Sequence, residues 1–193
     1  HISQVSCARS VEKIREAKAR GLRVTAAVSA HHLHLSEQDI GEFDTRYHVM
    51  PPLRSLADRD ALRQGVISGV IDAVCSNHQP HGMDAKLVPF SESAAGISGL
   101  DTVLSLVLKL VDETALSLPD AIARVTINPA KILGIEVGRL LPGSQADICI
   151  FDPTKYSQAT PDLLKSRGLN NVFLDQLLPG TVKAVLVAGR TIA

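Results

Sequence analysis

The sequence has few aromatic residues and no excess of charge of either sign. Phe, Trp and Tyr make up 3% of its 193 positions, and proteins that bind single-stranded nucleic acid usually stack the bases on such side chains. Lys and Arg number 20 together, as do Asp and Glu, so the formal net charge is zero. No basic surface, and hence no nucleic-acid partner, is expected. Because a chain without net charge resists self-association only weakly, we expect an oligomer.

Cysteine and long apolar runs are also scarce. Cys7, Cys75 and Cys149 lie far apart and match no zinc or disulfide spacing, which favours a reducing cytoplasm. No apolar stretch approaches the roughly 20 residues that a membrane-spanning helix needs, so no membrane contact is expected. The sequence also contains neither a phosphate-binding glycine-rich loop nor a Gly-x-Ser-x-Gly turn, and chemistry built on those motifs is not expected.

Short β-branched segments alternate with amphipathic ones along most of the chain. This alternation of strand, helix and strand is typical of a parallel sheet. Ser55 suits a helix N-cap and Gly21 a helix stop. The expected strands cover residues 1–6, 22–28, 70–75, 146–151 and 182–187, and the expected helices cover residues 10–20, 55–67, 97–112, 118–125 and 129–133. In the helix over 97–112 one apolar stripe is expected, made of Leu100, Val103, Leu104, Val107 and Leu108.

Two long loops follow two of these strands. The loop over residues 30–50 carries four of the seven histidines, and the loop over residues 76–96 opens with Ser-Asn-His-Gln-Pro-His at 76–81. At the C-terminal ends of the strands in a (β/α)-barrel, polar side chains point into the active-site mouth. We therefore expect the hexapeptide at 76–81 to line such a mouth.

This hexapeptide resembles the Asp-His-Ala-Pro-His motif of dihydroorotases, members of the cyclic amidohydrolase superfamily. The resemblance spans nearly the whole chain, and the order and spacing of its motifs carry it. Its other segments are Val5-Ser6 and residues 30–33, 51–54, 96–100, 142–147 and 185–190.

The resemblance implies an α/β fold in two parts. Residues 1–137 are expected to form the C-terminal portion of a (β/α)8 (TIM) barrel, with its last three strands. Residues 138–193 are expected to form the C-terminal part of a small β-rich subdomain. A barrel of this kind needs about 250 residues. We therefore expect this chain, which begins at His1, to be part of a longer protein whose N-terminal half completes the barrel.

Two residues depart from the dihydroorotase pattern at positions of metal ligands. Asn77 stands where the family has an Asp that lies at the metal centre and acts as general acid/base. Gln4, in the run Ser3-Gln4-Val5-Ser6, stands where the family has a zinc-binding His. Taken alone, Asn77 is a turn-forming residue and Gln4 is an ordinary polar residue at a barrel mouth. In the light of the resemblance they are two lost ligands, because a neutral amide binds zinc poorly and takes no proton near neutral pH. We expect no metal at this mouth.

Three further positions concern the substrate. Met50 replaces the Asn that precedes Pro-Pro-Leu-Arg in the family and contacts the dihydroorotate ring, and a thioether offers no amide donor. On its own, Met50 would fill a gap in the loop. His81 aligns with a substrate-contacting His and Gly96 with a backbone contact to the ligand, and both are retained. Ala94 and Ala95 replace a Pro-Phe pair of the substrate loop. The resemblance therefore implies a vestigial substrate site at Met50, His81 and Gly96.

The histidines of the first loop resemble a metal cluster at first sight. His31, His32 and His34 lie close in sequence, but neighbouring residues of an extended segment face opposite ways. The family's equivalents of His31 and His32 are not ligands. We expect surface or core-edge positions for these three residues, and a solvated loop position for His48.

The departures at Gln4, Met50 and Asn77 decide which function the resemblance implies. Degenerate dihydroorotases of this kind are non-catalytic partners of aspartate carbamoyltransferase, the preceding enzyme of pyrimidine biosynthesis. We therefore expect a dihydroorotase-like pseudoenzyme, a structural subunit that supports assembly of the transferase catalytic chain. Two alternatives stay open. One is an active zinc dihydroorotase in which other residues replace the lost ligands. The other is an allantoinase- or hydantoinase-like amidohydrolase with altered metal use.

Overall fold

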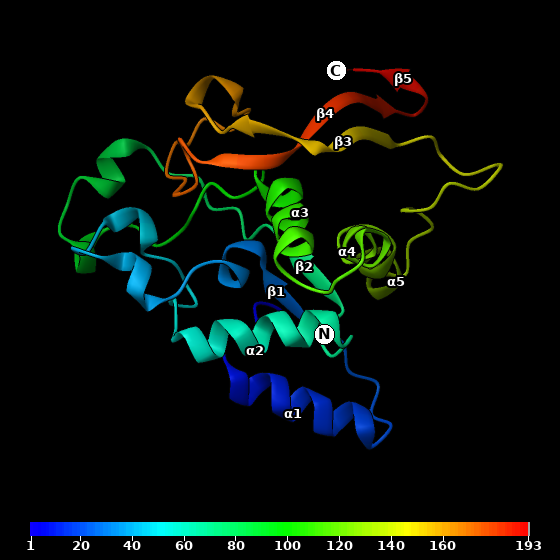
Figure 1. Cartoon of the computed structure of the whole chain (residues 1–193), viewed down its shortest axis with the longest axis horizontal. Coiled ribbons are helices and arrows are strands. Elements are labelled where there is room, and N and C mark those ends of the chain that lie inside the picture. The colour runs from blue at the N-terminus through cyan, green and yellow to red at the C-terminus, as the bar shows by residue number, and fades with distance from the viewer. Residues whose placement is uncertain (193) are drawn as a thin grey trace.

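Two short parallel strands form the centre of the N-terminal part of the computed structural model, which describes residues 1–192 (Figure 1). Strand β1 (Ala27–Ser29) pairs with strand β2 (Ala73–Cys75), and both are mostly buried. The first residues of the chain pair with the start of β1: Ile2 forms a parallel bridge to Ala26, and its carbonyl accepts from the backbone N–H of Ala27 at 2.9 Å. Small and β-branched residues suit strands that are covered on both faces. The expected α/β alternation is confirmed, although both strands are shorter than expected.

Helices α1 (Ala8–Ala19) and α2 (Leu56–Ile67) pack against each other below these strands in Figure 1. Helix α2 begins where the Ser55 side chain accepts a hydrogen bond from the backbone N–H of Asp58, as its N-cap position predicts. The Asp58 carboxylate in turn accepts from the backbone N–H of Ala8 at 2.8 Å. The starts of the two helices are thereby joined, and both helices confirm the expected spans to within two residues.

Helix α3 (Val103–Glu113) starts later than the sequence pattern predicts. Ile97 lies in a parallel bridge with His78, and its carbonyl accepts from the backbone N–H of Gln79 at 2.8 Å. Leu100 stays outside the helix with 61% of its surface exposed, so the expected apolar stripe is wrong at this position. The physical reason is that pairing with the loop after β2 outweighs local helix propensity. The buried residues of α3 are Leu106, Val107, Leu108 and Leu110.

The short helices α4 (Leu118–Ala123) and α5 (Ile127–Leu133) follow α3 and confirm the two helices expected there. Ser117 caps α4 by accepting from the backbone N–H of Asp120. Gly134 ends α5 in a left-handed conformation, with φ at 70°, which glycine adopts at little cost. Among the helices within residues 1–192, none combines the length and the apolar character needed to cross a membrane.

The C-terminal part is an antiparallel sheet of β3 (Ile148–Gln158), β4 (Leu177–Val187) and β5 (Arg190–Thr191). This sheet lies along α3 (Figure 1). Strand β4 passes so close to α3 that a Cβ atom at Gly180 would overlap the side chain of Leu108. Both strands expected in this region are present, and both are longer than expected.

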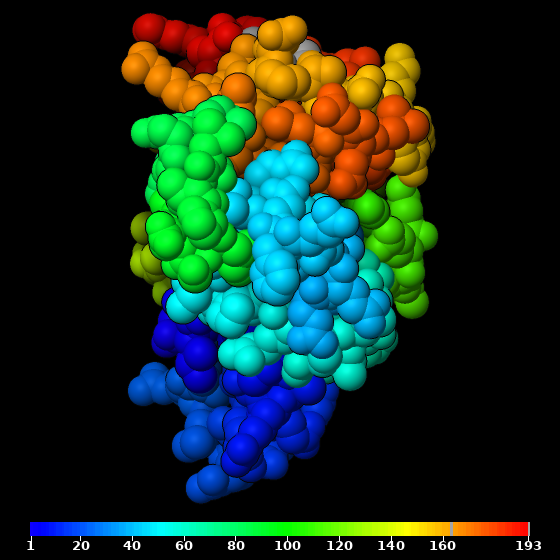
Figure 2. All heavy atoms as spheres, turned by 90° about the vertical axis from the view of Figure 1, so that its left-hand side faces the viewer, coloured from blue at the N-terminus to red at the C-terminus, as the bar shows by residue number. Residues whose placement is uncertain are grey.

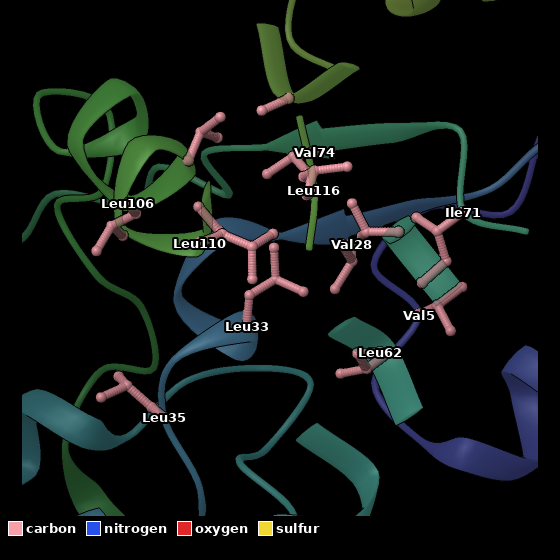
Figure 3. Close-up of a cluster of buried hydrophobic side chains, with 14 of the residues drawn as sticks. Val5, Val28, Leu33, Leu35, Leu62, Ile71, Val74, Leu106, Leu110 and Leu116 are labelled. Atoms are coloured by element: carbon pink, nitrogen blue, oxygen red, sulfur yellow. The ribbon is translucent and has the colours of Figure 1, made fainter. Parts of the chain in front are cut away.

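One apolar core joins these elements (Figure 3). Val28 of β1 and Val74 of β2 contribute to it from the strands, and Leu106 and Leu110 contribute from α3. Phe173, from the segment between β3 and β4, is among the largest fully buried side chains. The C-terminal region therefore shares the core of the N-terminal region. The domain boundary expected from the sequence stays a prediction.

Three histidines that follow β1 are part of this interior. His31, His32 and His34 are all buried, so of the expected surface or core-edge positions the surface ones are wrong. The reason is local: Ala30–Leu33 forms a single 3₁₀ helix that packs against α2 and α3. The His34 Nε2 atom lies 2.8 Å from the carbonyl oxygen of Leu106. Neither ring nitrogen of His31 has a hydrogen-bond partner within residues 1–192.

These buried histidines predict sensitivity to acid. Burial lowers the pKa of His31 well below its ordinary value of 6.5, and the neighbouring His32 lowers it further. Burial also lowers the pKa of His32 and of His34. The unfolded chain then binds protons that the folded chain excludes, so this stability is present above pH 6.5 and is lost as the pH falls below it. We expect the free energy of unfolding of the full-length protein, measured in urea, to fall between about pH 7 and pH 5.

Two variants check the origin of this effect. His31→Leu should flatten the pH dependence, because it removes one of the depressed groups. His1→Ala, at an exposed position, should leave the dependence unchanged. The same slope in the wild type and both variants would contradict the assignment to the buried histidines.

Candidate functional site

Two residues at strand ends have left-handed backbone conformations. Gln4, which follows the residues paired with β1, has φ at 55°, and Asn77, which follows β2, has φ at 44°. Asparagine adopts this conformation more readily than most residues, whereas glutamine does so rarely. Sparsely populated conformations of this kind gather at functional sites, where the surrounding structure holds them in place.

A chain of hydrogen bonds joins these two strand ends to the loop after β1. The Gln4 Nε2 atom donates to Asn77 Oδ1 at 2.8 Å, and the Asn77 Nδ2 atom donates to the backbone carbonyl of Met50 at 3.2 Å. The structure thus brings Gln4 and Asn77 together with the backbone of Met50, whose side chain is exposed. All groups in this chain of bonds are neutral amides, so it offers no carboxylate or imidazole for proton transfer.

The other two expected site residues, His81 and Gly96, are held within the loop after β2. The backbone N–H of His81 donates to Asn170 Oδ1 at 2.8 Å, and its ring atom Nε2 lies 3.0 Å from the carbonyl oxygen of Ala95. Gly96 has φ at 143°, and a Cβ atom there would lie 2.5 Å from the Cβ of Gln79. Only glycine fits such a position. Both residues therefore take part in the hydrogen bonds and packing that hold this loop in place.

Asn170 is fully buried, yet the sequence marks it only as part of a loop between two strands. Its Nδ2 atom donates to the carbonyl oxygens of Gln79 and Gly96, both at 3.0 Å. Its neighbour Asn171 donates to the carbonyl oxygen of Ser98 at 2.9 Å. An Asn-Asn pair signals a turn, but here Asn170 fixes the loop after β2 and Asn171 fixes the segment that follows it.

Lys86 is a second buried polar residue without a sequence signal. Its Nζ atom donates to the carbonyl oxygens of Ala94 at 2.6 Å, Thr45 at 2.9 Å and His48 at 3.4 Å. Burial lowers the pKa of this ammonium group. Lys86 thus joins the loop after β1 to the loop after β2. The His48 ring stacks on Phe90 with centroids 4.9 Å apart. His48 is half-buried, so the second loop covers part of a side chain that was expected to be solvated.

Zinc, which the sequence analysis associates with the dihydroorotase pattern, does not fit the side chains at this mouth. Zinc sites in proteins use thiolate, imidazole or carboxylate ligands. Gln4 and Asn77 offer neutral amide groups that are already bonded to each other. Within residues 1–192, no three His, Cys, Asp or Glu side chains come together as a metal ion would require. The expected lack of a metal in the full-length protein stays a prediction.

Comparisons with known proteins agree on one family. A model of the amidohydrolase family matches residues 6–192. A protein from Syntrophus aciditrophicus (strain SB) named dihydroorotase is 43% identical over 192 residues, which cover 100% of this chain and 45% of that protein. A dihydroorotase-like protein from Pseudomonas aeruginosa is 43% identical over 189 residues, which cover 98% of this chain and 44% of that protein.

A solved structure of a D-hydantoinase is also similar. It matches with a TM-score of 0.90 and 28% sequence identity over 100% of this chain and 44% of that one. The chain therefore spans less than half the length of the curated relatives it matches.

Removing the Asn170 side chain is expected to loosen the mouth. Asn170→Ala leaves the carbonyl oxygens of Gln79 and Gly96 and the N–H of His81 without their partner, and each unpaired buried group costs about 1–3 kcal/mol. We expect faster hydrogen exchange at the His81 amide of the full-length protein, measured by NMR. The Ala27 amide, which is bonded within the parallel strands, is the internal reference. Equal acceleration at both amides would indicate global destabilisation and contradict this local role.

Proposed function

The chain belongs to the amidohydrolase family, and from this membership we propose that it is part of a dihydroorotase-like pseudoenzyme of pyrimidine biosynthesis. In this proposal it supplies the last three strands of a (β/α)8 barrel and part of a β-rich subdomain. The protein acts in the cytoplasm as a structural subunit for the catalytic chain of aspartate carbamoyltransferase. It performs no hydrolysis and holds no metal at Gln4 and Asn77. The relatives named dihydroorotase and dihydroorotase-like protein support this branch of the family.

One observation carries the non-catalytic part of the proposal: the Asn77 side chain is an amide whose two polar atoms are both engaged. Its Oδ1 accepts from Gln4 and its Nδ2 donates to the Met50 carbonyl. An amide does not take a proton from a water molecule near neutral pH. Loss of a general base alone typically lowers the rate by about 10²–10⁴. These substitutions support a chain that is retained for its shape.

Exposed apolar side chains on the mouth loops support a role in subunit contact. Phe43, Met83 and Leu87 are large and exposed, and Lys86 joins the two loops that carry them. Figure 2 shows these loops, sky-blue and green, next to each other on one face. Exposed apolar patches are typical of protein interfaces, and a preordered surface loses less conformational freedom on binding. Stable complexes usually bury about 1,200 Å² or more, so this surface would form one part of the contact.

A second apolar surface supports completion of the barrel by the protein's own N-terminal half. A hollow of about 340 Å³ beside α1 exposes mainly apolar surface, from side chains such as Ile2, Ile14 and Val24, although Arg9, Ser10 and Lys13 also line it. Among the described residues, Ile2 has a β-bridge partner on one side only, which is Ala26 next to β1. The other edge of this segment has no strand beside it within residues 1–192. A further strand and helix would satisfy this edge and fill the hollow.

An active hydrolase of cyclic amides is the second candidate function. The 43% identity to a protein named dihydroorotase favours it, as does the similarity to a D-hydantoinase structure. Such an enzyme would need a general base and zinc ligands from outside the described residues, or an altered use of metal. The metal content of the full-length protein and a dihydroorotate hydrolysis assay separate the two candidates.

We expect the full-length protein to co-purify with the catalytic chain of aspartate carbamoyltransferase. In its absence the transferase should lose activity or assembly, as measured by size-exclusion chromatography and a transferase assay. Asn77→Ala should leave the complex intact, because the Asn77 side chain bonds Gln4 and the Met50 carbonyl and is not one of the exposed apolar side chains proposed to form the contact. Full assembly and normal activity of the transferase without this protein would refute the proposed role and bring the hydrolase candidate forward.

A matched pair of variants tests the contact surface in the same assay. Leu87→Ser removes a side chain that is 77% exposed on the mouth loops, and Leu140→Ser makes the same change at a 79% exposed site between α5 and β3. We expect the first to weaken binding about tenfold, which corresponds to about 1.4 kcal/mol. The second should change it less than about twofold. Equal effects would place the contact elsewhere.

Restoring the carboxylate alone is not expected to restore hydrolysis. Asn77→Asp leaves Gln4 and Met50 changed, and residues of one catalytic unit act non-additively. The variant should therefore show no turnover of dihydroorotate above the wild type and no stoichiometric zinc in elemental analysis. Measurable turnover in this single variant would mean that the rest of the site is intact and would favour the active hydrolase.

A further inference from the structure

The hydrogen bond between Gln4 and Asn77 connects two strand ends that are not direct neighbours in the sheet. The residues before Gln4 pair with β1, and β1 pairs with β2, after which Asn77 follows. Strand β1 therefore lies between the two ends. The 2.8 Å bond from Gln4 Nε2 to Asn77 Oδ1 links them across the mouth. A metal ion bound at both positions would make the same connection.

The backbone on both sides holds the two side chains in this arrangement. Directly after Gln4, the N–H of Val5 donates to the carbonyl oxygen of Ala27 at 2.9 Å. Shortly after Asn77, the N–H of Gln79 donates at 2.8 Å to the segment before α3. These bonds fix both strand ends next to their left-handed residues. The backbone bonds therefore present the two side chains to each other, and the direct link between the two ends is the side-chain bond.

The donors and acceptors of this link are matched one to one. Gln4 Nε2 donates to Asn77 Oδ1, and Asn77 Nδ2 donates to the Met50 carbonyl at 3.2 Å. Three segments of the mouth are joined in this way. Because both side chains are neutral amides, the link needs no counter-ion and does not titrate near neutral pH.

We propose that this amide bridge replaces the metal ion as the structural link at the mouth, so that the strand ends stay together without a cation. The inference rests on the non-catalytic part of the proposed function. It explains how the strand ends at the mouth stay in place when the residues there are not metal ligands. It also makes Gln4 and Asn77 a coupled pair, in which each substitution depends on the other.

The first test replaces the donor of the bridge with an acceptor of the same shape. Gln4→Glu places a carboxylate oxygen against Asn77 Oδ1 in place of the Nε2 donor. We expect the thermal midpoint of the full-length protein to fall by about 2–8 °C near pH 8, as for an unpaired polar group. Gln64→Glu, on the exposed side of α2, is the matched control and should shift the midpoint by less than about 1 °C.

The second test uses cations. Zinc, manganese and a chelator should leave the thermal midpoint of the wild type unchanged. The double variant Gln4→Glu/Asn77→Asp puts two carboxylates on the same frame beside the Met50 carbonyl, and such oxygen donors suit manganese. Its midpoint should fall below that of either single variant without cation. It should rise by several degrees with about 1 mM manganese, because binding to the folded state stabilises it.

Three results would overturn the inference. One is an equal midpoint for Gln4→Glu and Gln64→Glu. Another is a zinc-dependent rise in the wild type that Asn77→Ala abolishes, and the third is a double variant that does not respond to manganese. These midpoints are measured without the transferase. If the midpoints contradict the bridge but the complex with the transferase forms, only this inference fails. If the midpoints are as expected but no complex forms, only the proposed partner fails.

Discussion

The mouth depends on one constraint, which is that the buried side chain of Asn170 must satisfy all its polar atoms. It does so by bonding to the backbone of three residues in the loop after β2, namely Gln79, His81 and Gly96. The partners lie more than 70 positions away in the sequence. A buried polar group without a partner is costly, so the loop and the C-terminal segment hold each other in place. The C-terminal part is thus needed to shape a mouth that the N-terminal part carries.

Local signals predict the helices of this chain and fail where distant segments meet. The Ser55 cap and the Gly21 stop act within a few residues, so α1 and α2 lie where the pattern places them. The helix expected from residue 97 fails because Ile97 pairs with His78. No periodicity encodes such a bridge, since it depends on a strand end some twenty residues earlier in the chain.

The candidate site likewise contains residues that the sequence predicts and residues that it does not. In the sequence alone, strand ends and the family resemblance point to Gln4 and Asn77, and the fold brings their side chains together. Nothing in the sequence points to Lys86 or Asn170. Their partners are backbone carbonyl and N–H groups, which do not depend on the side chain of the partner residue, so no pattern of residue types marks them. Residues that bind backbone atoms are for this reason the hardest to predict.

The mouth shows which exchanges a strand end can accept without a change in its backbone. Asn77 has φ at 44°, a conformation that asparagine and aspartate both tolerate, so this exchange leaves the backbone in place. The amide adds a donor that reaches the Met50 carbonyl, which a carboxylate would repel. Its oxygen then needs a donor in return, and Gln4 provides one that a carboxylate at that position would not. A mouth whose polar groups satisfy one another has few left to bind a ligand, and this is the physical argument for the structural role that we propose.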